Sequence, residues 1–226
     1  MAETVHEVKA PRQQRSRDSQ ERLLKAAEAL IKSKGFEALT TAEVVRRSRT
    51  SIGTLYARFG DKTALLHAVQ DRVQSREEAL MRAQLAKVDW DTLSLEESVR
   101  QLLQIKQTAN EGDDRLYEAF VVHGATDPVL RAQGYRHKAV VETLEVEILL
   151  KYADEIGHAD PEDAARVASR LAQAAQEEYV QRSLARDSLP AVAPPDLLLQ
   201  RLAEVIIAYL KNPQPAACGD GATAGD

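Results

Sequence analysis

The sequence is poor in cysteine, in aromatic residues and in long apolar runs. Its one cysteine, Cys218, lies in a polar stretch, so no disulfide bond can form within the chain. This cysteine usage is typical of a reducing cytoplasm, where we expect the protein to reside. Aromatic residues make up 4% of the chain, and no apolar run approaches the roughly 18 residues of a membrane span. The N-terminal residues lack the apolar core of a signal peptide.

Motifs for catalysis and cofactor binding are also missing. The sequence has no glycine-rich phosphate loop, no nucleophile elbow and no HExxH zinc motif. His123 and His137 could be grouped with Glu118 or Glu142, but no pair has both the spacing and the partners that a metal site needs. We therefore expect no enzyme, no cofactor and no metal ion.

Charge divides unevenly along the chain, although its net value of -5 argues against a nucleic-acid partner. Residues 1–62 carry 13 Lys and Arg against 8 Asp and Glu, a net charge of +5, whereas residues 63–226 carry 17 against 27, a net charge of -10. A basic N-terminal part on an acidic body is the asymmetry expected when one end contacts phosphates.

The pattern of apolar residues predicts an all-α protein of about nine helices. Ala, Leu, Glu, Arg and Gln dominate, and no strand pattern or internal repeat is present. Capping boxes at Thr40/Glu43 and Ser94/Glu97 and Asp-Pro starts at Asp127 and Asp160 mark helix beginnings. The predicted helices span residues 18–35, 40–49, 51–59, 61–84, 94–109, 113–123, 128–156, 161–185 and 196–211.

The segment between Gly35 and Leu65 is the most informative part of the chain. It contains two short helical patterns separated by a tight turn near Arg49 and Thr50. The second pattern is rich in small, hydroxyl-bearing, aromatic and basic residues that a solvent-facing helix does not need. Such a pair is typical of a helix-turn-helix whose second helix enters the DNA major groove.

These residues resemble the N-terminal signature of the TetR family of bacterial transcriptional repressors. The resemblance covers residues 20–66 and rests on an ordered set of positions: Gly35-Phe36, Thr40-Thr41, Ser51-x-Gly53-Thr54-Leu55-Tyr56, Phe59 and Lys62-x-x-Leu65. It implies a homodimer that binds a palindromic operator in double-stranded DNA. It also implies that a small-molecule effector, bound in the C-terminal bundle, releases the protein from DNA.

The expected domains follow from the resemblance and the composition. Residues 1–17 form a flexible basic arm, residues 18–60 a three-helix DNA-binding domain, residues 61–211 a ligand-binding and dimerisation bundle, and residues 212–226 a disordered tail. Lys9, Arg12, Arg15 and Arg17 give the arm its charge. Such an arm either enters the minor groove or only aids solubility.

Several positions are expected at the DNA. Ser51 and Thr54 can reach base edges or phosphates, and Gly53 permits close approach of the backbone. The resemblance assigns phosphate contacts to Tyr56 and Lys62. The alternatives are that Ser51 only caps its helix, that Tyr56 is half-buried core, and that Thr54 and Lys62 are solvated. The complete predicted DNA-binding set is Thr40, Thr41, Arg49, Ser51, Ile52, Gly53, Thr54, Tyr56 and Lys62.

Three residues of this region depart from the family pattern. Arg49 stands where the family usually has glycine, so either the turn differs or the chain tolerates a left-handed arginine that costs about 1–2 kcal/mol. Thr50 replaces an apolar residue. Ile52 replaces a polar one, and it either contacts a thymine methyl group, which predicts A·T content in the operator, or is buried.

The C-terminal bundle offers candidates for two further sites. Apolar faces on the last two helices either form a dimer interface or complete the monomer core, and the resemblance favours the interface. The predicted interface residues are Leu171, Ala175, Leu202, Val205, Ile206 and Tyr209. The predicted ligand pocket combines aromatic and polar residues, which are Tyr117, Phe120, His123, Arg136 and His137.

The sequence thus predicts a ligand-responsive DNA-binding repressor. The alternative is a helical scaffold or protein-interaction module that has lost operator binding, which the altered turn at Arg49 and Thr50 would explain.

Overall fold

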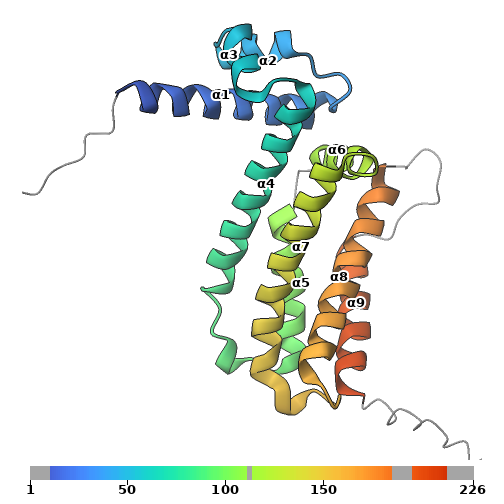
Figure 1. Ribbon diagram of the computed structural model, residues 1–226. Coiled ribbons are helices and arrows are strands. Elements are labelled where there is room, and N and C mark those ends of the chain that lie inside the picture. The colour runs from blue at the N-terminus through green and yellow to red at the C-terminus, as the bar shows by residue number, and fades with distance from the viewer. Residues whose placement is uncertain (1–10, 111–113, 185–194, 213–226) are drawn as a thin grey trace, which may run out of the picture. The chain divides into compact units, whose positions relative to one another are not determined.

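A computed structural model of the chain describes residues 11–110, 114–184 and 195–212 (Figure 1). Within these ranges it contains nine α helices, two 3-10 helices and no strand, which confirms the expected all-helical fold. The helices are α1 (Pro11–Lys34), α2 (Thr41–Ser48), α3 (Ile52–Phe59), α4 (Lys62–Leu85), η1 (Trp90–Thr92), α5 (Leu95–Asn110), α6 (Asp114–Gly124), α7 (Pro128–Leu149), η2 (Leu150–Glu155), α8 (Pro161–Leu184) and α9 (Pro195–Lys211). Lys9, Cys218 and the predicted tail beyond residue 212 lie outside the described residues.

Most helices begin at the capping residues that the sequence indicates. The Ser94 hydroxyl accepts a bond from the Glu97 amide at 3.3 Å, and Glu97 Oε2 accepts the Ser94 amide at 2.9 Å. Asp160 Oδ1 likewise accepts the amide of Asp163 at 3.0 Å. These bonds satisfy amides that have no partner inside the helix, and so they fix where each helix begins.

The first helix departs from the prediction. It begins at Pro11 rather than at residue 18, so residues 11–17 of the predicted flexible arm are helical. Proline at the first helical position has no N–H of its own that would lack a partner, and its backbone angle suits a helix. The polar residues that follow are good helix formers, which explains why a segment without an apolar face still continues the helix.

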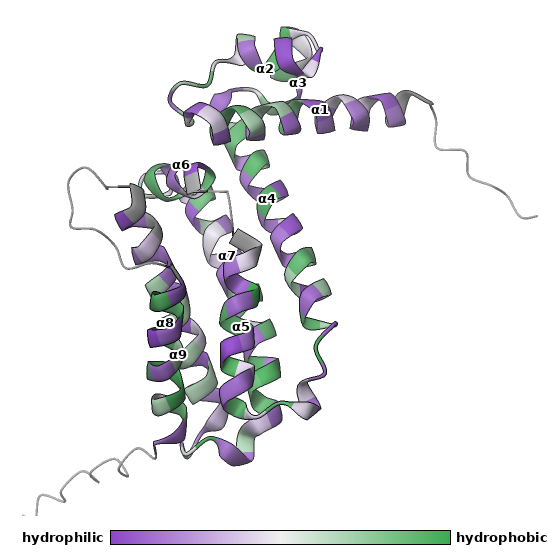
Figure 2. Cartoon of the chain, turned by 180° about the vertical axis from the view of Figure 1, so that it is seen from behind, coloured by the Kyte–Doolittle hydropathy of each residue, from purple (hydrophilic) through white to green (hydrophobic). Residues whose placement is uncertain are grey.

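The chain packs as two compact units. The first comprises residues 1–75 and 113–134, and the second comprises residues 76–112 and 135–226. This division by packing differs from the functional boundary predicted at residues 60/61, because the first half of α4 and helix α6 pack with the N-terminal helices. Hydrophobic and hydrophilic residues alternate along each helix (Figure 2), so each helix buries only one face.

The first unit has its own apolar core. Helix α1 packs against α2 and α6, and α2 packs against α3. Leu23 and Ile31 of α1, Val44 of α2 and Leu55 of α3 are at most 1% exposed in that core. Burying side chains of this size contributes about 1.5–3 kcal/mol each, and the core thereby fixes the orientation of α3.

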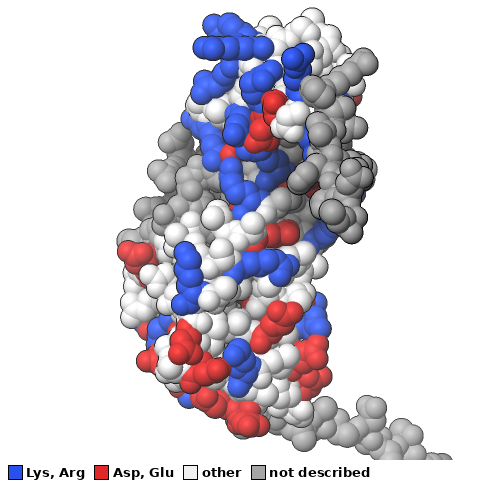
Figure 3. Space-filling view, turned by 90° about the vertical axis from the view of Figure 1, so that its left-hand side faces the viewer, with Lys and Arg blue, Asp and Glu red and all other residues white. Residues whose placement is uncertain are grey.

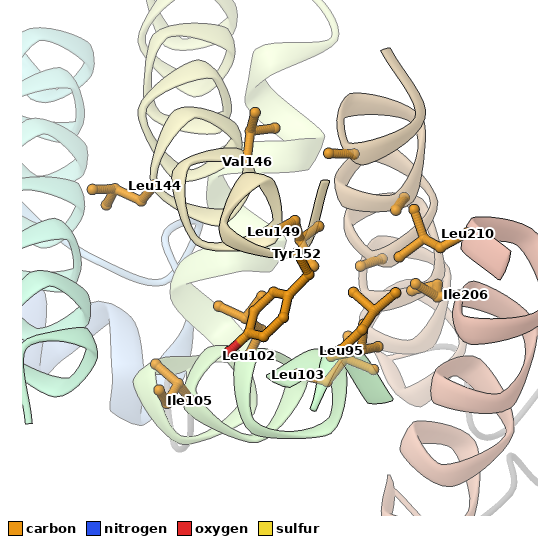
Figure 4. Close-up of a cluster of buried hydrophobic side chains, with 14 of the residues drawn as sticks. Leu95, Leu102, Leu103, Ile105, Leu144, Val146, Leu149, Tyr152, Ile206 and Leu210 are labelled. Carbon is orange, nitrogen blue, oxygen red and sulfur yellow. The ribbon is translucent and has the colours of Figure 1, made fainter. Parts of the chain in front are cut away.

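The second unit is a helical bundle with a separate core. Helix α9 packs closely against α5 and α8. Its interior contains Leu102 and Leu103 of α5, Leu149 at the end of α7, Tyr152 of η2 and Ile206 of α9 (Figure 4). Trp90, which the sequence places in a loop, is buried in η1 and donates its indole N–H to the Leu85 carbonyl at 2.9 Å. No helix among the described residues is long and apolar enough to cross a membrane.

Candidate nucleic-acid interface

The turn between α2 and α3 adopts the geometry of a helix-turn-helix despite its unusual residues. Arg49 has φ of 53° and ψ of 45°, and it is the only non-glycine residue with positive φ in the described ranges. The Thr50 amide donates to the Val45 carbonyl at 3.1 Å, which closes the end of α2. The turn therefore keeps the left-handed conformation that glycine would favour, at a cost of about 1–2 kcal/mol.

Polar contacts replace apolar packing at this turn. The Thr50 hydroxyl lies 2.8 Å from the Ser48 hydroxyl, and the guanidinium of Arg22 on α1 donates to the Ser48 carbonyl at 3.2 Å. A threonine at position 50 thus has a hydrogen-bond partner that an apolar side chain could not use. These contacts attach the turn to α1 and hold it in place.

Helix α3 begins at a capped serine. The Ser51 hydroxyl accepts a bond from the Thr54 amide at 3.1 Å, as predicted, and lies 2.8 Å from the Thr54 hydroxyl. Both hydroxyls are therefore engaged with each other in the free protein. A hydroxyl can donate one bond and accept two, so each retains capacity for a further partner.

The two faces of α3 differ in burial. Leu55 is fully buried against the first core, whereas Ile52 and Tyr56 are 45% and 48% exposed. Gly53 adds no side chain on the same outer surface, where a Cβ atom would meet only the Ser51 hydroxyl at 3.9 Å. Ile52 is therefore exposed rather than buried in the free protein, and Tyr56 is about half-buried. An outward face of this kind is available to another molecule.

Lys62 stands in the first turn of α4 and already has partners. Its ammonium donates to the Glu37 carbonyl at 3.3 Å and lies 4.3 Å from the centroid of the Phe36 ring. The Asp61 carboxylate accepts the Ala64 amide at 2.7 Å and caps the helix. Lys62 is therefore not an unattached surface charge, and one bond leaves further ammonium donors for an anion.

Basic side chains surround this region. Arg46, Arg47 and Arg49 are exposed, as are Arg15 and Arg17 of α1. In the view of Figure 3, Lys and Arg predominate on the N-terminal unit, whereas acidic residues are frequent on the C-terminal unit. The positive charge predicted for the N-terminal part of the chain therefore lies on the surface, where it would attract phosphates.

Arg58 connects α3 to the N-terminal turns of α1. Its guanidinium donates to Gln20 at 3.1 Å and to the Ser16 hydroxyl. The sequence offered no signal for this contact, because a pairing across some forty residues has no local pattern. The contact holds the N-terminal turns of α1 beside α3.

A second pairing that the sequence did not reveal lies at the start of α7. His67 Nε2 is 2.7 Å from Asp127 Oδ2, while Asp127 Oδ1 accepts the Val129 and Leu130 amides at 2.8 and 3.1 Å. The hydrogen bond from His67, aided by these amides, lowers the pKa of the Asp127 carboxyl. The pair borders a hollow of about 430 Å³ that is also lined by Phe36 and His123.

The residues predicted for a ligand pocket are divided between the two packing units. Tyr117, Phe120 and His123 belong to the first unit, whereas Arg136 and His137 belong to the second. Phe120 is buried in the first core, and His123 lines the hollow beside Glu37 and Phe36. His137 lies 3.0 Å from Glu78 and 3.5 Å from Glu77, while Arg136 is exposed. No group of metal-binding side chains occurs in the described ranges.

The residues predicted for the dimer interface differ in solvent exposure. Leu171 on α8 and Val205 on α9 are 41% and 59% exposed. Ala175, Leu202 and Tyr209 are partly exposed. Ile206, in contrast, is 3% exposed in the monomer core, where it packs with α5 and α8 residues.

Comparisons with known proteins agree with this geometry. Residues 23–69 match the profile described as "Bacterial regulatory proteins, tetR family". No curated protein matches the sequence. The solved structure of GusR from Salmonella enterica is similar at a TM-score of 0.63 with 19% identity, over 92% of this chain and 100% of that one.

Two further solved structures resemble the chain. A regulatory protein of the tetR family from Rhodococcus RHA1 has a TM-score of 0.56 and 16% identity, over 85% of this chain and 96% of that one. A transcriptional regulator from Saccharomonospora viridis, solved in complex with choline, has a TM-score of 0.65 and 14% identity, over 84% and 96%. At such identities the likeness shows the fold.

The capped α3, the left-handed turn and the basic surface belong to an all-helical fold with an N-terminal helix-turn-helix. The resemblance of the sequence to the TetR family is confirmed by the matched profile over residues 23–69. The chain has the fold of a TetR-family transcriptional regulator with an N-terminal DNA-binding domain.

Proposed function

We propose that the protein is a repressor that binds a palindromic operator as a homodimer in the bacterial cytoplasm and is released by a small-molecule effector. The observation that carries this proposal is the outward face of α3, on which Ile52 and Tyr56 are half-exposed while Leu55 anchors the helix. A short helix that follows a helix-turn-helix turn and exposes large side chains to solvent can insert into the major groove.

The contacts within this interface support distinct roles. Ile52 and Gly53 would approach base edges, where an apolar side chain favours a thymine methyl group. Tyr56 would donate its phenol to a phosphate, and Ser51 and Thr54 would add hydroxyl contacts. Thr40 and Thr41 at the start of α2 stand where a helix N-terminus favours an anion.

Arg49 and Lys62 would supply charge on either side of α3. Arg49 occupies a strained position in the turn, which is expected where a guanidinium is needed at a phosphate. Lys62 would donate to the DNA phosphate backbone with the N–H groups that its contacts with Glu37 and Phe36 leave available. The departures at Arg49 and Thr50, which favoured a scaffold, leave the turn's hydrogen bonds in place.

The last two helices would form the dimer interface. Exposed Leu171 and Val205, with the partly exposed Ala175, Leu202 and Tyr209, would meet the same residues of a second protomer across a two-fold axis. Ile206 would contribute through the monomer core that supports this face. A dimer that uses one side of the DNA places its half-site centres about 34–36 Å apart.

The C-terminal bundle within residues 61–211 would bind the effector, as the fold permits. The similar regulator from Saccharomonospora viridis was solved with choline bound, which supports a small-molecule role for this fold. Tyr117, Phe120, His123, Arg136 and His137 remain the predicted contacts. Effector and operator would be coupled, so each would weaken the other's binding by the same factor.

Selection of DNA fragments from the source genome by the purified protein at near-physiological salt would test this function. We expect a recovered palindrome, bound by the wild-type chain. Tyr56→Asp should lose that selection, whereas Tyr135→Asp, a change at a 65% exposed tyrosine outside α3, should retain it. Recovery of no sequence by the wild-type chain, tested also after extraction of any bound effector, would support the scaffold alternative instead.

A further inference from the structure

The N-terminal turns of α1 lie outside the part of the chain that matches the family profile. The helix begins at Pro11, whereas the match begins at residue 23. We call residues 11–20 the N-terminal extension of α1. It contains three arginines and one aspartate, and Pro11 is its only apolar residue. The N-terminal end of α1 projects past α2 and α3 (Figures 1 and 2). Packing against the core therefore does not account for this extension.

Arg58, in the last turn of α3, holds the extension in place. One guanidinium nitrogen donates to Gln20 Oε1 at 3.1 Å, and another donates to the Ser16 hydroxyl. Ser16 and Gln20 are one turn apart on the same face of α1, so the planar guanidinium can meet both. The Arg58 Nε atom is buried and makes no hydrogen bond among the described residues, because the side chain lies against α1. The extension is thus fixed relative to α3.

The arginines of the extension differ from the basic residues further along the helix. Lys25 pairs with Glu21 one turn before it, at 3.5 Å. Arg15 and Arg17 are exposed, and no carboxylate of the described residues pairs with either. The only acid of the extension, Asp18, accepts a glutamine side chain at 2.9 Å instead. The positive charge of these turns is therefore not neutralised within the described chain.

The position of these arginines also opposes the dipole of their own helix. The N-terminal end of a helix carries partial positive charge, which favours acidic residues there and disfavours basic ones. The first turn of α1 has no acidic residue. Ion pairing, core packing and the helix dipole all fail to explain a basic extension, whereas a polyanion would interact favourably with all of its positive charges.

The extension continues the basic surface of the helix-turn-helix. Arg22 donates to the carbonyl of Ser48, beside Arg49 in the turn, at 3.2 Å. Arg15 precedes Arg22 by two helical turns, so both lie on the same side of α1, roughly 10 Å apart. Arg15 is therefore on the side of α1 from which Arg22 reaches the turn. A duplex bound at α3 and the turn would have phosphates along this side.

We propose that the N-terminal extension of α1 is a second, rigid DNA-binding element. It binds duplex phosphates through Arg15 and Arg17, and Arg58 is a positioning residue that acts through Ser16 and Gln20. Contacts with phosphates add affinity without reading bases, so the extension strengthens binding and leaves base preference to α3. This inference rests on the proposed DNA binding, but it requires neither a palindrome nor an effector.

A duplex of about 30 base pairs with arbitrary sequence, about three helical turns, is the first probe. Fluorescence anisotropy with the full chain gives Kd from about 50 to about 200 mM salt. Arg15→Gln with Arg17→Gln removes both charges and keeps a good helix former at each position. We expect binding at least about tenfold weaker near 100 mM salt, and a slope of log K against log salt reduced by about 2 per bound protomer.

The matched control removes two charges of the same helix that already have partners. Lys25→Gln with Lys32→Gln eliminates ammonium groups that pair with Glu21 and Glu28. This variant should keep the wild-type slope. An unchanged slope in the arginine variant, or an equal loss in the lysine control, would overturn the proposal, because the effect would then be absent or would reflect net charge alone.

A neutral variant tests the positioning by Arg58. Ser16→Ala with Gln20→Ala removes both acceptors and changes no charge. We expect binding at least about threefold weaker, since arginines that are no longer held must be ordered on binding. The control, Gln14→Ala with Ser19→Ala, changes the same residue types in the same turns, where the described residues show no contact with α3, and should bind as the wild type does. Equal binding by both variants would show that the extension acts as a flexible arm.

Combining the variants separates positioning from a general disturbance of α3. Added to the variant that lacks Arg15 and Arg17, the alanines at positions 16 and 20 should weaken binding no further, because they act only through those arginines. A further loss of the same size as in the wild-type background would overturn the positioning role.

The selected operator distinguishes this proposal from the proposed function. If the wild type recovers a palindrome and the arginine variant binds it equally tightly, the repressor function stands and the second DNA-binding element is wrong. If the wild type binds the arbitrary duplex through Arg15 and Arg17 but selects no operator, the element stands and the repressor function fails. If the wild type binds neither DNA, both fail.

Discussion

Arg49 combines a strained backbone conformation with an exposed basic side chain. Its backbone lies in the left-handed region, which costs a non-glycine residue about 1–2 kcal/mol, and its side chain is exposed. Nothing in the fold of the free protein requires an arginine at that position. The strain is understandable if the guanidinium binds a phosphate when DNA is present.

Replacement of Arg49 should therefore move stability and DNA binding in opposite directions. Arg49→Gly should raise the free energy of unfolding by roughly 0.5–1 kcal/mol, since glycine adopts the left-handed conformation without strain. The same change should weaken operator binding and reduce the slope of log K against log salt by about 1. Urea unfolding and fluorescence anisotropy at several salt concentrations measure the two effects.

The matched control is Arg49→Lys, which keeps the charge and the strain. It should keep the salt slope and the stability of the wild type. An unchanged salt slope in Arg49→Gly would show that the guanidinium does not reach a phosphate.

Ile52 should determine part of the base preference. It is 45% exposed on α3, and an apolar contact to a thymine methyl group is worth part of the roughly 1–3 kcal/mol that a mismatched base pair typically costs. Ile52→Ala should lower affinity for the selected operator and relax the preference for A·T at one position of each half-site. Competition binding with single-base variants measures this, and unchanged discrimination would contradict the assignment.

Local patterns predicted the residues whose roles are local. Ser51 caps α3 and Thr40 caps α2 because each side chain bonds to an amide three residues away, which a sequence displays directly. The Lys62 contact with Phe36 and the His67–Asp127 pair escaped prediction. Those pairings depend on how distant helices pack, and no spacing in the sequence reports them.

At the scale of the helix, the contrast between local signals and distant contacts explains which helix boundaries were predictable. Capped helices such as α5 and α8 begin where their serine or aspartate indicates. Helix α1 extends back to Pro11 without an apolar face, and periodicity cannot detect a polar extension of that kind. The contact of Arg58 with Ser16 and Gln20 accounts for its position beside α3.

The charge on the cap of α7 should make thermal stability depend on pH. His67 lowers the pKa of Asp127, so the stability gained from that carboxylate is present above the ordinary aspartate pKa near 3.9 and is lost as pH falls through the lowered value. Asp127→Asn keeps a capping oxygen but removes the charge. We expect a lower Tm than wild type at pH 7 and a difference that shrinks below about pH 4.

Asp160→Asn is the matched control for that experiment. Asp160 caps α8 through the amides of Glu162 and Asp163, and the described residues provide it with no histidine partner. It should give a smaller change in Tm at pH 7. Equal changes in the two variants would show that the cap alone, and not the His67 pairing, accounts for the effect.

Exposed apolar residues on α8 and α9 should control dimerisation. Val205→Asp places a charge in the proposed two-fold interface and should shift the protein from dimer to monomer. Val122→Asp on α6 is a matched control, because both valines are 59% exposed. Sedimentation equilibrium measures the change. A dimer that persists in Val205→Asp, or dissociates equally in Val122→Asp, would place the interface elsewhere.

For the molecule as a whole, the proposed dimerisation would determine how many phosphates are contacted at once. The monomer core can be derived from one chain, since Ile206 packs with residues of its own protomer. The exposed Leu171 and Val205 have no such explanation within one chain. For the same reason the periodicity of α8 and α9 left the dimer undecided, because a face toward a core and a face toward a partner have the same spacing.

The salt dependence of operator binding should therefore follow the oligomeric state. Each phosphate contact contributes about 0.9 to the slope of log K against log salt, and two protomers double the number of contacts made by one. Fluorescence anisotropy from about 50 to about 300 mM salt measures this slope. Monomeric Val205→Asp should show about half the slope of the wild type. Its affinity should also fall, since the second half-site no longer binds at an effective concentration set by the dimer.

Two comparisons make this result specific. Val122→Asp should keep the full slope, because it leaves α8 and α9 intact. A DNA fragment with one half-site should give the reduced slope even with the wild-type protein, since the second recognition helix then has no specific contacts. If the Val205→Asp monomer keeps the full slope on the complete operator, one protomer makes all the phosphate contacts, and the two-fold arrangement of α3 helices on the palindrome is wrong.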